Sequence, residues 1–155
     1  MNEPASNWGD WGRLLLLANV AATLYMVGLI WQVQVVHYPL FAQVGDAGFA
    51  TYERLHSNLI SLVVGPPMLL EAATTALLLV HRPPGVRFPA ALLGAILLAA
   101  IWLSTMFLQV PQHGRLAAGF DVEAHRFLVL SNWIRTIAWT ARGALALWMT
   151  AKAMR

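Results

Sequence analysis

Four of the five histidines lie at the ends of long apolar segments, where their side chains could form one site. His37 closes the first segment, His56 opens the second, His113 follows the third and His125 opens the fourth. Neutral imidazole is a common ligand of zinc, copper and iron. Because the chain contains no cysteine, only histidine, carboxylate, amide and methionine groups could complete such a site. These four histidines are therefore the predicted ligands of a transition metal, copper, iron or zinc, or of a haem.

The kind of site depends on how many of these side chains converge. Gln109, at the end of the third apolar segment, is a further candidate ligand. Three histidines would leave an open position for oxygen or a substrate, whereas four would form a closed, structural site. In the haem alternative two histidines would be axial ligands, and Arg135 would meet a propionate. If the histidines do not converge, each is an interfacial residue without a chemical role.

A polar stripe follows one face of the last apolar segment. Its residues alternate at spacings of three and four, which keeps them within an arc of roughly 100° on a helix. The stripe consists of His125, Leu128, Asn132, Arg135, Trp139 and Arg142. An arginine at the bilayer centre costs at least about 2.5–3.5 kcal/mol on insertion scales, so this face should point into the protein.

The two arginines of the stripe differ in the partner available at their depth. Glu71 is the only acid within an apolar segment. At about 1.5 Å per residue, Glu71 and Arg142 both lie roughly 21–22 Å deep, so we predict a structural ion pair between them. Arg135 lies about 12 Å deep, where no acid is available. Arg135 and Asn132 are expected either to complete the packing or to contact an anionic or oxygen-rich ligand, which makes them candidate catalytic residues.

The helices that position these residues can be predicted from the amino-acid composition. The chain has 155 residues, of which 59% are hydrophobic and 11% are charged, too apolar a balance for a water-soluble domain. A bilayer core about 30 Å thick requires about 20 apolar residues per helix. Four stretches meet this requirement: 14–36, 57–80, 89–108 and 127–151. They predict an all-α membrane protein with one domain over residues 1–155, an up-down bundle of four transmembrane helices.

Basic residues are distributed unevenly over the connections. One end of the predicted bundle carries an excess of Arg and Lys, whereas the other connections balance Arg against Asp and Glu. By the positive-inside rule both termini are cytoplasmic. We expect a multi-pass integral protein of the bacterial cytoplasmic membrane with its histidine-rich face outward and only His81 inside. The arginines are assigned to helix ends and buried positions, so no binding to nucleic acid is predicted.

Local signals predict where the helices begin, bend and end. Asp46 and Asp121 precede the second and fourth helices and are predicted N-caps. Pro39 predicts that the first helix stops just before it. The pair Pro66-Pro67 lies inside the second helix and should kink it.

The segment "VPQHGRL", followed by "NWIRTIAWTAR", resembles the end of the small four-helix membrane proteins grouped around anthrone oxygenases. Those proteins also have a proline-polar-leucine turn before a last helix that carries Trp, Asn and Arg. The resemblance covers about the last third of the chain and does not include the histidine-rich connections. It implies oxygenation of a hydrophobic aromatic substrate, with Asn132 and Arg135 near the substrate.

The first functional hypothesis is a membrane-embedded oxidoreductase, oxygenase-like, that acts on a lipophilic small molecule in an outer histidine pocket above Arg135. Two alternatives leave open whether the chain is an enzyme. One is a non-catalytic subunit of a homo-oligomer or larger membrane complex, with Gly94 and neighbouring alanines in a close helix contact. The other is a small cation transporter or channel that uses the Pro66-Pro67 break and Glu71.

Overall fold

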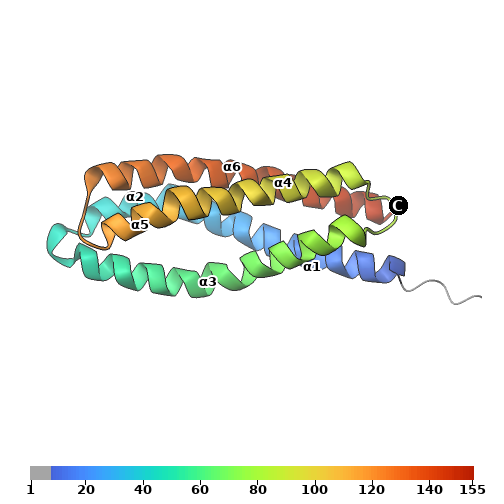
Figure 1. The fold of residues 1–155 in the computed structure, drawn as a ribbon, viewed down its shortest axis with the longest axis horizontal. Helices are drawn as coiled ribbons and strands as arrows, with labels where there is room; N and C mark the ends of the chain where they lie inside the picture. The colour runs from blue at the N-terminus through green and yellow to red at the C-terminus, as the bar shows by residue number, and fades with distance from the viewer. Residues whose placement is uncertain (1–7) are drawn as a thin grey trace, which may run out of the picture.

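The computed structural model describes residues 8–155, which are helical along almost their whole length. Four long helices, α1, α3, α4 and α6, are connected by shorter helical pieces and turns. The elements are α1 (Trp8–Gln32), η1 (Val33–His37), α2 (Tyr38–Leu40), η2 (Phe41–Gln43), α3 (Asp46–Val80), α4 (Phe88–Ser104), η3 (Thr105–Gln109), α5 (Val110–Leu116) and α6 (Val122–Ala153). Successive rods run in opposite directions along one long axis (Figure 1). The prediction of an all-α fold is confirmed for the residues described.

The first rod continues past the point where the sequence predicted its end. A π-helical turn, η1, leads directly into α2 and η2, so the rod extends to Gln43. Pro39 lies in the first turn of α2, where a missing backbone N–H removes no hydrogen bond within that helix. The prediction that the helix stops before Pro39 was therefore wrong, and His37 lies inside the rod.

The third rod repeats this arrangement. A second π-helical turn, η3, joins α4 to α5, and Pro111 occupies the first turn of α5. His113 therefore lies within a helix, and the prediction that it follows the helix in a connection was wrong. The helices extend beyond the predicted spans 14–36 and 89–108, because in each rod a π turn precedes the proline and the helix goes on.

The two remaining helices begin differently. The side chain of Asp121 accepts hydrogen bonds from the backbone N–H groups of Glu123 and Ala124, which confirms it as the N-cap of α6. Asp46 is instead the first residue of α3, after Gly45, and makes no capping hydrogen bond, so that prediction was wrong. The helix α3 passes through Pro66-Pro67 without interruption and changes direction near its middle (Figure 1).

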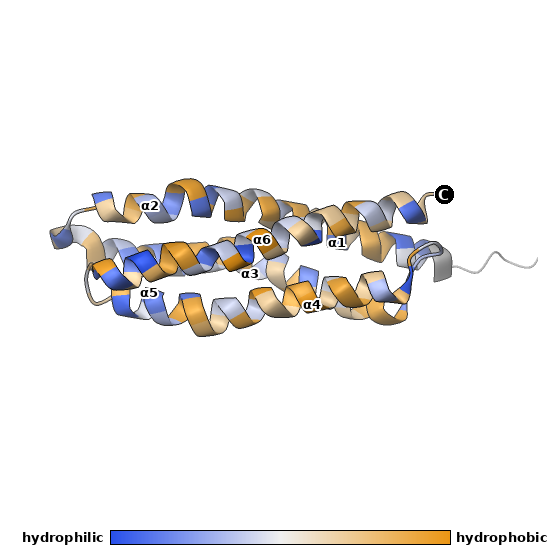
Figure 2. Ribbon diagram, turned by 90° about the horizontal axis from the view of Figure 1, so that it is seen from above, coloured by the Kyte–Doolittle hydropathy of each residue, from blue (hydrophilic) through white to orange (hydrophobic). Residues whose placement is uncertain are grey.

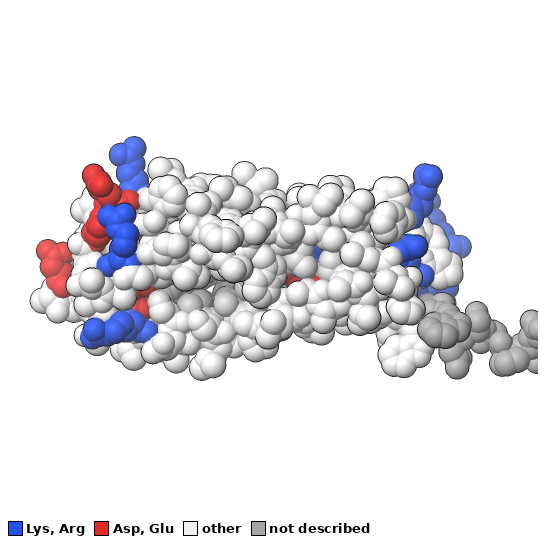
Figure 3. Space-filling model, in the orientation of Figure 1, with Lys and Arg blue, Asp and Glu red and all other residues white. Residues whose placement is uncertain are grey.

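Three of the rods are long and apolar enough to cross a membrane. They are Asp10–Gln43, Asp46–Val80 and Phe88–Leu116. The fourth rod, α6, is not among them, because the polar stripe lowers its hydropathy. Apolar residues cover most of the length of the bundle (Figure 2), and in the face shown charged atoms gather at its two ends (Figure 3). The structure is thus compatible with an integral membrane protein.

The bundle has a polar interior between two apolar cores. The larger core includes Phe41, Phe49 and Leu128, and the smaller one includes Leu16 and Met149. Helix α1 packs against α3 and α6, and α4 packs against α6, whereas α3 is less closely packed against α4. The loosest side of the bundle is therefore the one between α3 and the rod formed by α4, η3 and α5.

The capping difference between the two aspartates can be tested directly. Asp121→Ala removes two capping hydrogen bonds and the ion pair with Arg115, so we expect it to lower the midpoint temperature of unfolding by a few degrees. Asp46→Ala, the matched control, should change it much less. Thermal unfolding in detergent, followed by helical circular dichroism, measures both.

The same variant has a predictable pH dependence. The N–H of Ala124 and the guanidinium of Arg115 hold the pKa of Asp121 below its usual value. A carboxyl group with a lowered pKa stabilises the fold above its unfolded-state pKa and loses this effect as the pH falls through the folded-state pKa. The difference between wild type and Asp121→Ala should therefore vanish in acid. A difference that persists there would contradict the capping role.

Candidate functional site

The inner arginine of the α6 stripe is paired as the sequence predicted. Arg142 Nε lies 2.6 Å from Glu71 Oε1, and both side chains are buried. Glu71 Oε1 also accepts from Thr23 Oγ1 at 2.7 Å, and Glu71 Oε2 accepts from Trp139 Nε1 at 3.1 Å. Both carboxylate oxygens are therefore occupied by donors from α1 and α6.

The remaining groups around this pair are also bonded. Arg142 donates to the carbonyl oxygen of Gly94 and to Thr75 Oγ1. Asn19 Nδ2 donates to Thr74 Oγ1 at 2.9 Å and to Thr75 Oγ1 at 3.0 Å. This network joins all four long helices and satisfies its charges internally, so we describe it as the inner lock.

The outer arginine has a different environment. Arg135 is 8% exposed and donates Nε to Asn132 Oδ1 at 2.9 Å, Nη2 to Tyr38 Oη at 3.2 Å and Nη1 to Thr105 Oγ1 at 3.3 Å. Asn132 Nδ2 in turn donates to Gln34 Oε1 at 2.9 Å, which orients the amide oxygen toward Arg135. All acceptors around this guanidinium are neutral, and no ion pair of the described residues includes it.

A hydrogen-bonded chain leads from Arg135 to a buried carboxylate. Tyr38 Oη lies 3.0 Å from His113 Nε2, and His113 Nδ1 lies 2.6 Å from Glu53 Oε1. Glu53 is 0% exposed and also accepts from Ser57 Oγ at 3.0 Å. In the tautomer in which the Nδ1–H of His113 donates to the Glu53 carboxylate, Nε2 accepts the Tyr38 hydroxyl. The order of the chain is thus Glu53, His113, Tyr38, Arg135.

A second histidine pair lies beside this chain. His37 Nε2 is 2.9 Å from His56 Nδ1, and the rings of His56 and His113 have centroids 5.4 Å apart. Two buried atoms in this group, His56 Nε2 and Glu53 Oε2, have no hydrogen-bond partner. Glu53 and His56 are three residues apart on α3, so a Glu-x-x-His spacing in the sequence places both on one helix face.

The other two predicted ligands have different partners. His125 Nε2 donates to the backbone carbonyl of Tyr38 at 2.8 Å, and its ring stacks on Phe41 with centroids 6.3 Å apart. Gln109 lies between serines: it accepts from Ser104 Oγ and donates to Ser131 Oγ, both at 3.0 Å. The structure therefore brings His37, His56 and His113 together but directs His125 to backbone and Gln109 to hydroxyl groups.

The geometry gives no separate support for metal binding. Within residues 8–155 no three His, Cys, Asp or Glu side chains are placed to hold a metal ion. The histidines are arranged instead as hydrogen-bonded partners of one another, of Tyr38 and of Glu53. A metal or haem at these histidines stays a prediction from the sequence.

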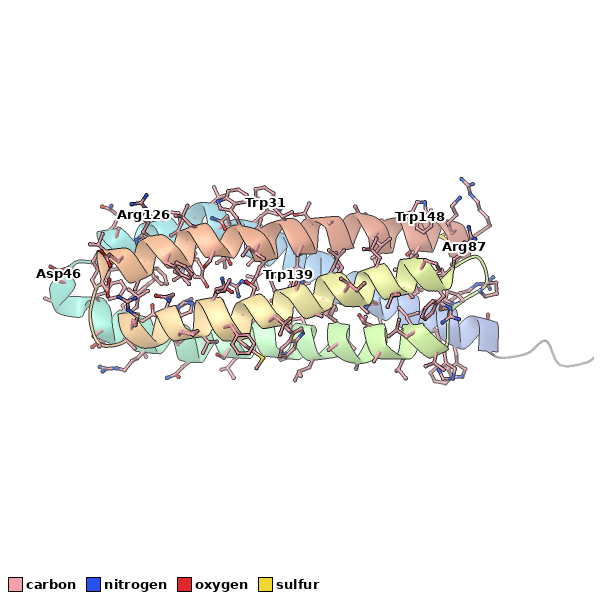
Figure 4. The ribbon with its side chains drawn as sticks, turned by 45° about the horizontal axis from the view of Figure 1, so that its top comes forward. Trp31, Asp46, Arg87, Arg126, Trp139 and Trp148 are labelled. Atoms are coloured by element: carbon pink, nitrogen blue, oxygen red, sulfur yellow. The ribbon has the colours of Figure 1, made fainter. Side chains whose placement is uncertain are left out.

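A cleft of about 540 Å³ opens beside the Arg135 end of this network. It lies between α3 and the rod of α4, η3 and α5, where the bundle is most loosely packed, and Figure 3 shows the flank of the molecule hollowed between the charged ends. One part of its lining is apolar, with Met26, Ile30, Val64, Met68 and Val110, and the other is polar, with Tyr38, Thr105, Gln109, His113 and Arg135. Trp139 also lines the cleft and lies between the helices at mid-length (Figure 4).

Polar residues that line the cleft lie in or directly after the two π-helical turns. The turn η1 sets the positions of Gln34 and of the following Tyr38, while η3 supplies Thr105 and Gln109. Such π turns occur frequently at functional sites because they redirect side chains within a continuous helix. The sequence reasoning identified Arg135, Asn132 and the histidines but missed Tyr38 and Glu53; the Glu-x-x-His spacing in "ERLH" was the available signal for Glu53.

Comparisons with protein-family models, with curated proteins and with solved structures found no match. The resemblance to the anthrone oxygenases therefore stays a prediction. One of its two segments, "VPQHGRL", forms helix α5 in the structure and not a turn.

The inner lock predicts a characteristic pattern of stability. Arg142→Met leaves the fully buried Glu71 without its counter-ion and should lower the free energy of unfolding by about 3–5 kcal/mol. The double variant Glu71→Leu, Arg142→Met removes both charges and should be less destabilised than either single variant. Denaturant titrations in mixed micelles measure all three. Additive losses in the double variant would show that the two side chains are not coupled.

Proposed function

We propose that this chain is a membrane-embedded oxidoreductase, oxygenase-like, that binds a lipophilic, oxygen-bearing substrate in the cleft beside Arg135. The observation that carries the proposal is the composition of that cleft. Its apolar part suits a hydrocarbon or aromatic body, while Arg135, Tyr38 and His113 lie together at its polar part. A buried arginine with only neutral partners is expensive to maintain in a membrane protein and is typical of a functional site.

We further propose that all four rods cross the bilayer, with both termini on the cytoplasmic side. Helix α6 has 32 residues, and at about 1.5 Å per residue its length of about 48 Å exceeds the hydrocarbon thickness of about 30 Å. Its buried arginines are enclosed by the other helices, so its low hydropathy does not oppose insertion. Arg87 and Trp148 lie toward one end of the bundle, and Asp46 and Arg126 lie at the other (Figure 4). The positive-inside rule then assigns the end with Arg87 to the cytoplasm.

In this orientation the cleft faces the outer half of the bilayer. Arg54 and Ser57 line it near the outer end of α3, and Val64 and Met68 line it further in. A lipophilic substrate would enter laterally between α3 and α5 without crossing the aqueous phase. Its polar oxygen would then lie near the outer surface and its body deeper in the hydrocarbon.

Each polar residue has a distinct role in this proposal. Arg135 and Tyr38 would hold the substrate oxygen by hydrogen bonds, and Asn132 would position Arg135 through the bonds from Nε and Nη2. His113, oriented by Glu53, would accept or return a proton during the reaction. Glu53 is thus a positioning residue, whereas Arg135, Tyr38 and His113 line the substrate site.

The geometry favours this proposal over a cation path. Both carboxylate oxygens of Glu71 accept hydrogen bonds from protein donors, so the one acid predicted to serve such a path is already neutralised by Arg142. Gly94 is buried inside the bundle against Arg142, so it is not available for the helix contact expected of a non-catalytic subunit. Neither alternative uses the amphipathic cleft.

The transmembrane arrangement can be tested by cysteine labelling, since the natural chain has none. Ala118→Cys, in the turn after α5, and Pro84→Cys, in the turn after α3, are both exposed positions. We expect a membrane-impermeant maleimide to label Ala118→Cys in intact cells and Pro84→Cys only after the membrane is opened. Labelling of both from the same side would contradict a four-span arrangement.

Occupancy of the cleft can be tested with a photoreactive lipophile. Benzophenones react readily with methionine, and Met26 and Met68 line the cleft while Met106 is 54% exposed on the outside of the bundle. In nanodiscs, decyl-benzophenone should label Met68 in wild type. Gly114→Phe should reduce this labelling at least fivefold, because Gly114 lines the cleft and an added Cβ there meets no neighbour.

Gly28→Phe is the matched control, since Gly28 lies outside the cleft and also has open space at its Cβ. Labelling of Met106 should be unchanged in both variants. Oxygen consumption with anthrone as the probe should exceed that of empty nanodiscs for wild type and Gly28→Phe, but not for Gly114→Phe or Arg135→Gln. Equal Met68 labelling in all proteins would contradict the binding site, and labelling without oxygen consumption would contradict the oxygenase assignment.

A further inference from the structure

Basic side chains gather at the end of the bundle opposite the histidines. They lie at the start of α1, in the turn between α3 and α4 and at the end of α6, and they are Arg13, Arg82, Arg87, Lys152 and Arg155. In the face shown in Figure 3, Lys and Arg atoms occupy this end without Asp or Glu atoms beside them. Of the acidic side chains that the structure describes, only Asp10 lies at this end, and it pairs with Arg13 at 3.5 Å. No ion pair among residues 8–155 includes any of the other four cations.

The turn between α3 and α4 brings these charges together. Val86 is buried in the smaller apolar core, which also contains residues of α1 and α6. A Cβ at Gly12 would lie 2.8 Å from the backbone nitrogen of Pro83, and a Cβ at Gly85, whose φ is +85°, would meet the carbonyl oxygen of Lys152. The turn is therefore in direct contact with the start of α1 and the end of α6. Packing thus holds the basic residues on both sides of the turn at this place, without opposite charges.

Two of the cations lie over aromatic rings that are exposed on the flank of the bundle. The guanidinium carbon of Arg82 is 5.2 Å from the ring centroid of Phe88, and Lys152 Nζ is 5.7 Å from the ring centroid of Trp148. Phe88 is 49% exposed and Trp148 is 45% exposed. Tryptophan is typical of the boundary between headgroups and hydrocarbon, and long basic side chains keep their charge at headgroup level. The cations therefore lie where lipid phosphates lie, beside a surface that suits acyl chains.

We propose that this basic end binds the headgroup of an anionic phospholipid, with the acyl chains of the lipid against the neighbouring flank of the bundle. Charge complementarity supports this occupant, because a phosphodiester supplies the negative charge that the described part of the chain lacks at this end. A phosphatidylcholine headgroup also carries a positive charge and gives no net compensation. The inference concerns the opposite end of the bundle from the cleft and does not depend on the proposed reaction or its substrate.

A soluble anion, such as an acidic protein segment, fits this surface less well. Arg82 and Lys152 lie against rings on apolar helix flanks, and Val80, 72% exposed, and Met154, 81% exposed, extend the apolar surface. An aqueous partner would leave that surface uncovered, whereas a phospholipid covers both the charges and the apolar side chains. In the proposed orientation this end also lies at the cytoplasmic leaflet, where anionic lipids are found.

Native mass spectrometry of the protein in dodecyl maltoside measures this binding directly. Dioleoylphosphatidylglycerol is the anionic probe, and dioleoylphosphatidylcholine, with the same acyl chains, is the zwitterionic reference. We expect wild type to bind the anionic lipid about tenfold or more tightly, and added salt should reduce this preference because it screens surface charges. Glycerophosphoglycerol, the soluble headgroup, and a hexaglutamate peptide should not displace the lipid, because neither has acyl chains.

Substitutions at the basic end should remove the preference in steps. Arg87→Gln should weaken binding of phosphatidylglycerol about fivefold, the factor that corresponds to about 1 kcal/mol for one basic residue near an anionic surface. Adding Lys152→Gln should bring the affinities for the two lipids to within about twofold of each other. Arg87→Lys keeps the charge and should bind as wild type does. Arg126→Gln, at an exposed arginine of the opposite end, is the matched control and should also leave the preference unchanged.

Equal affinity of wild type for the two lipids would overturn the inference, whether or not any variant folds. An equal loss in Arg87→Gln and Arg126→Gln, both shown to be folded by helical circular dichroism, would overturn it as well, because net charge and not this surface would then select the lipid. Displacement of the lipid by glycerophosphoglycerol or by the peptide would overturn a phospholipid as the occupant and assign the surface to a soluble anion.

Discussion

The need to satisfy two arginines within an apolar helical bundle determines the arrangement of this protein. Arg135 and Arg142 lie two turns apart on one face of α6, and both are buried. In hydrocarbon an unsatisfied guanidinium is costly, so the other helices must present oxygen atoms at both levels. They do so with Glu71 at the inner level and with Tyr38 and Thr105 at the outer level, where Asn132 of α6 itself supplies a further oxygen. The rotation of α6 about its axis follows from this requirement.

The two levels are satisfied in different ways, and in the proposed function the inner level serves stability and the outer level serves binding. At the inner level a carboxylate neutralises Arg142, and all donors and acceptors of the pair end on protein groups. At the outer level Arg135 has hydrogen bonds but no counter-charge, and it borders a cleft. The first arrangement closes the bundle, whereas the second leaves one positive charge available to a bound molecule.

The polar lining of the cleft depends on irregular helix geometry. Two π-helical turns, each followed by a proline in the first turn of the next helix, lie in the rods that border the site. A regular α-helix through these segments would rotate the residues beyond the turn by a large fraction of a turn. Tyr38 and His113 would then no longer both face Glu53 and Arg135. The two π-helical turns thus allow hydrogen bonds between different rods while each rod stays helical.

Much of the helical framework was evident in the sequence, because burial in an apolar medium imposes simple rules. The apolar stretches predicted helices, the spacing of the α6 stripe predicted its inward face, and equal depth predicted the pair of Glu71 with Arg142, which the structure contains. The helix ends were less predictable. Proline usually marks the end of a helix, but at Pro39 and Pro111 a π turn precedes the proline and the rod continues. The sequence showed that four histidines lie at the same end of the bundle, but it did not predict the hydrogen-bond partner of each.

An all-helical, largely apolar protein with a polar stripe that has to be buried could be inferred from the sequence, since these properties depend on composition and on residues close together in the chain. The site depends instead on how the rods are placed relative to one another. Glu53, His113 and Tyr38 come from three different rods, and their hydrogen bonds depend on the relative rotation and height of those rods to within an ångström or so. No local pattern carries that information, because a shift of one helical turn would preserve every periodicity and separate every partner.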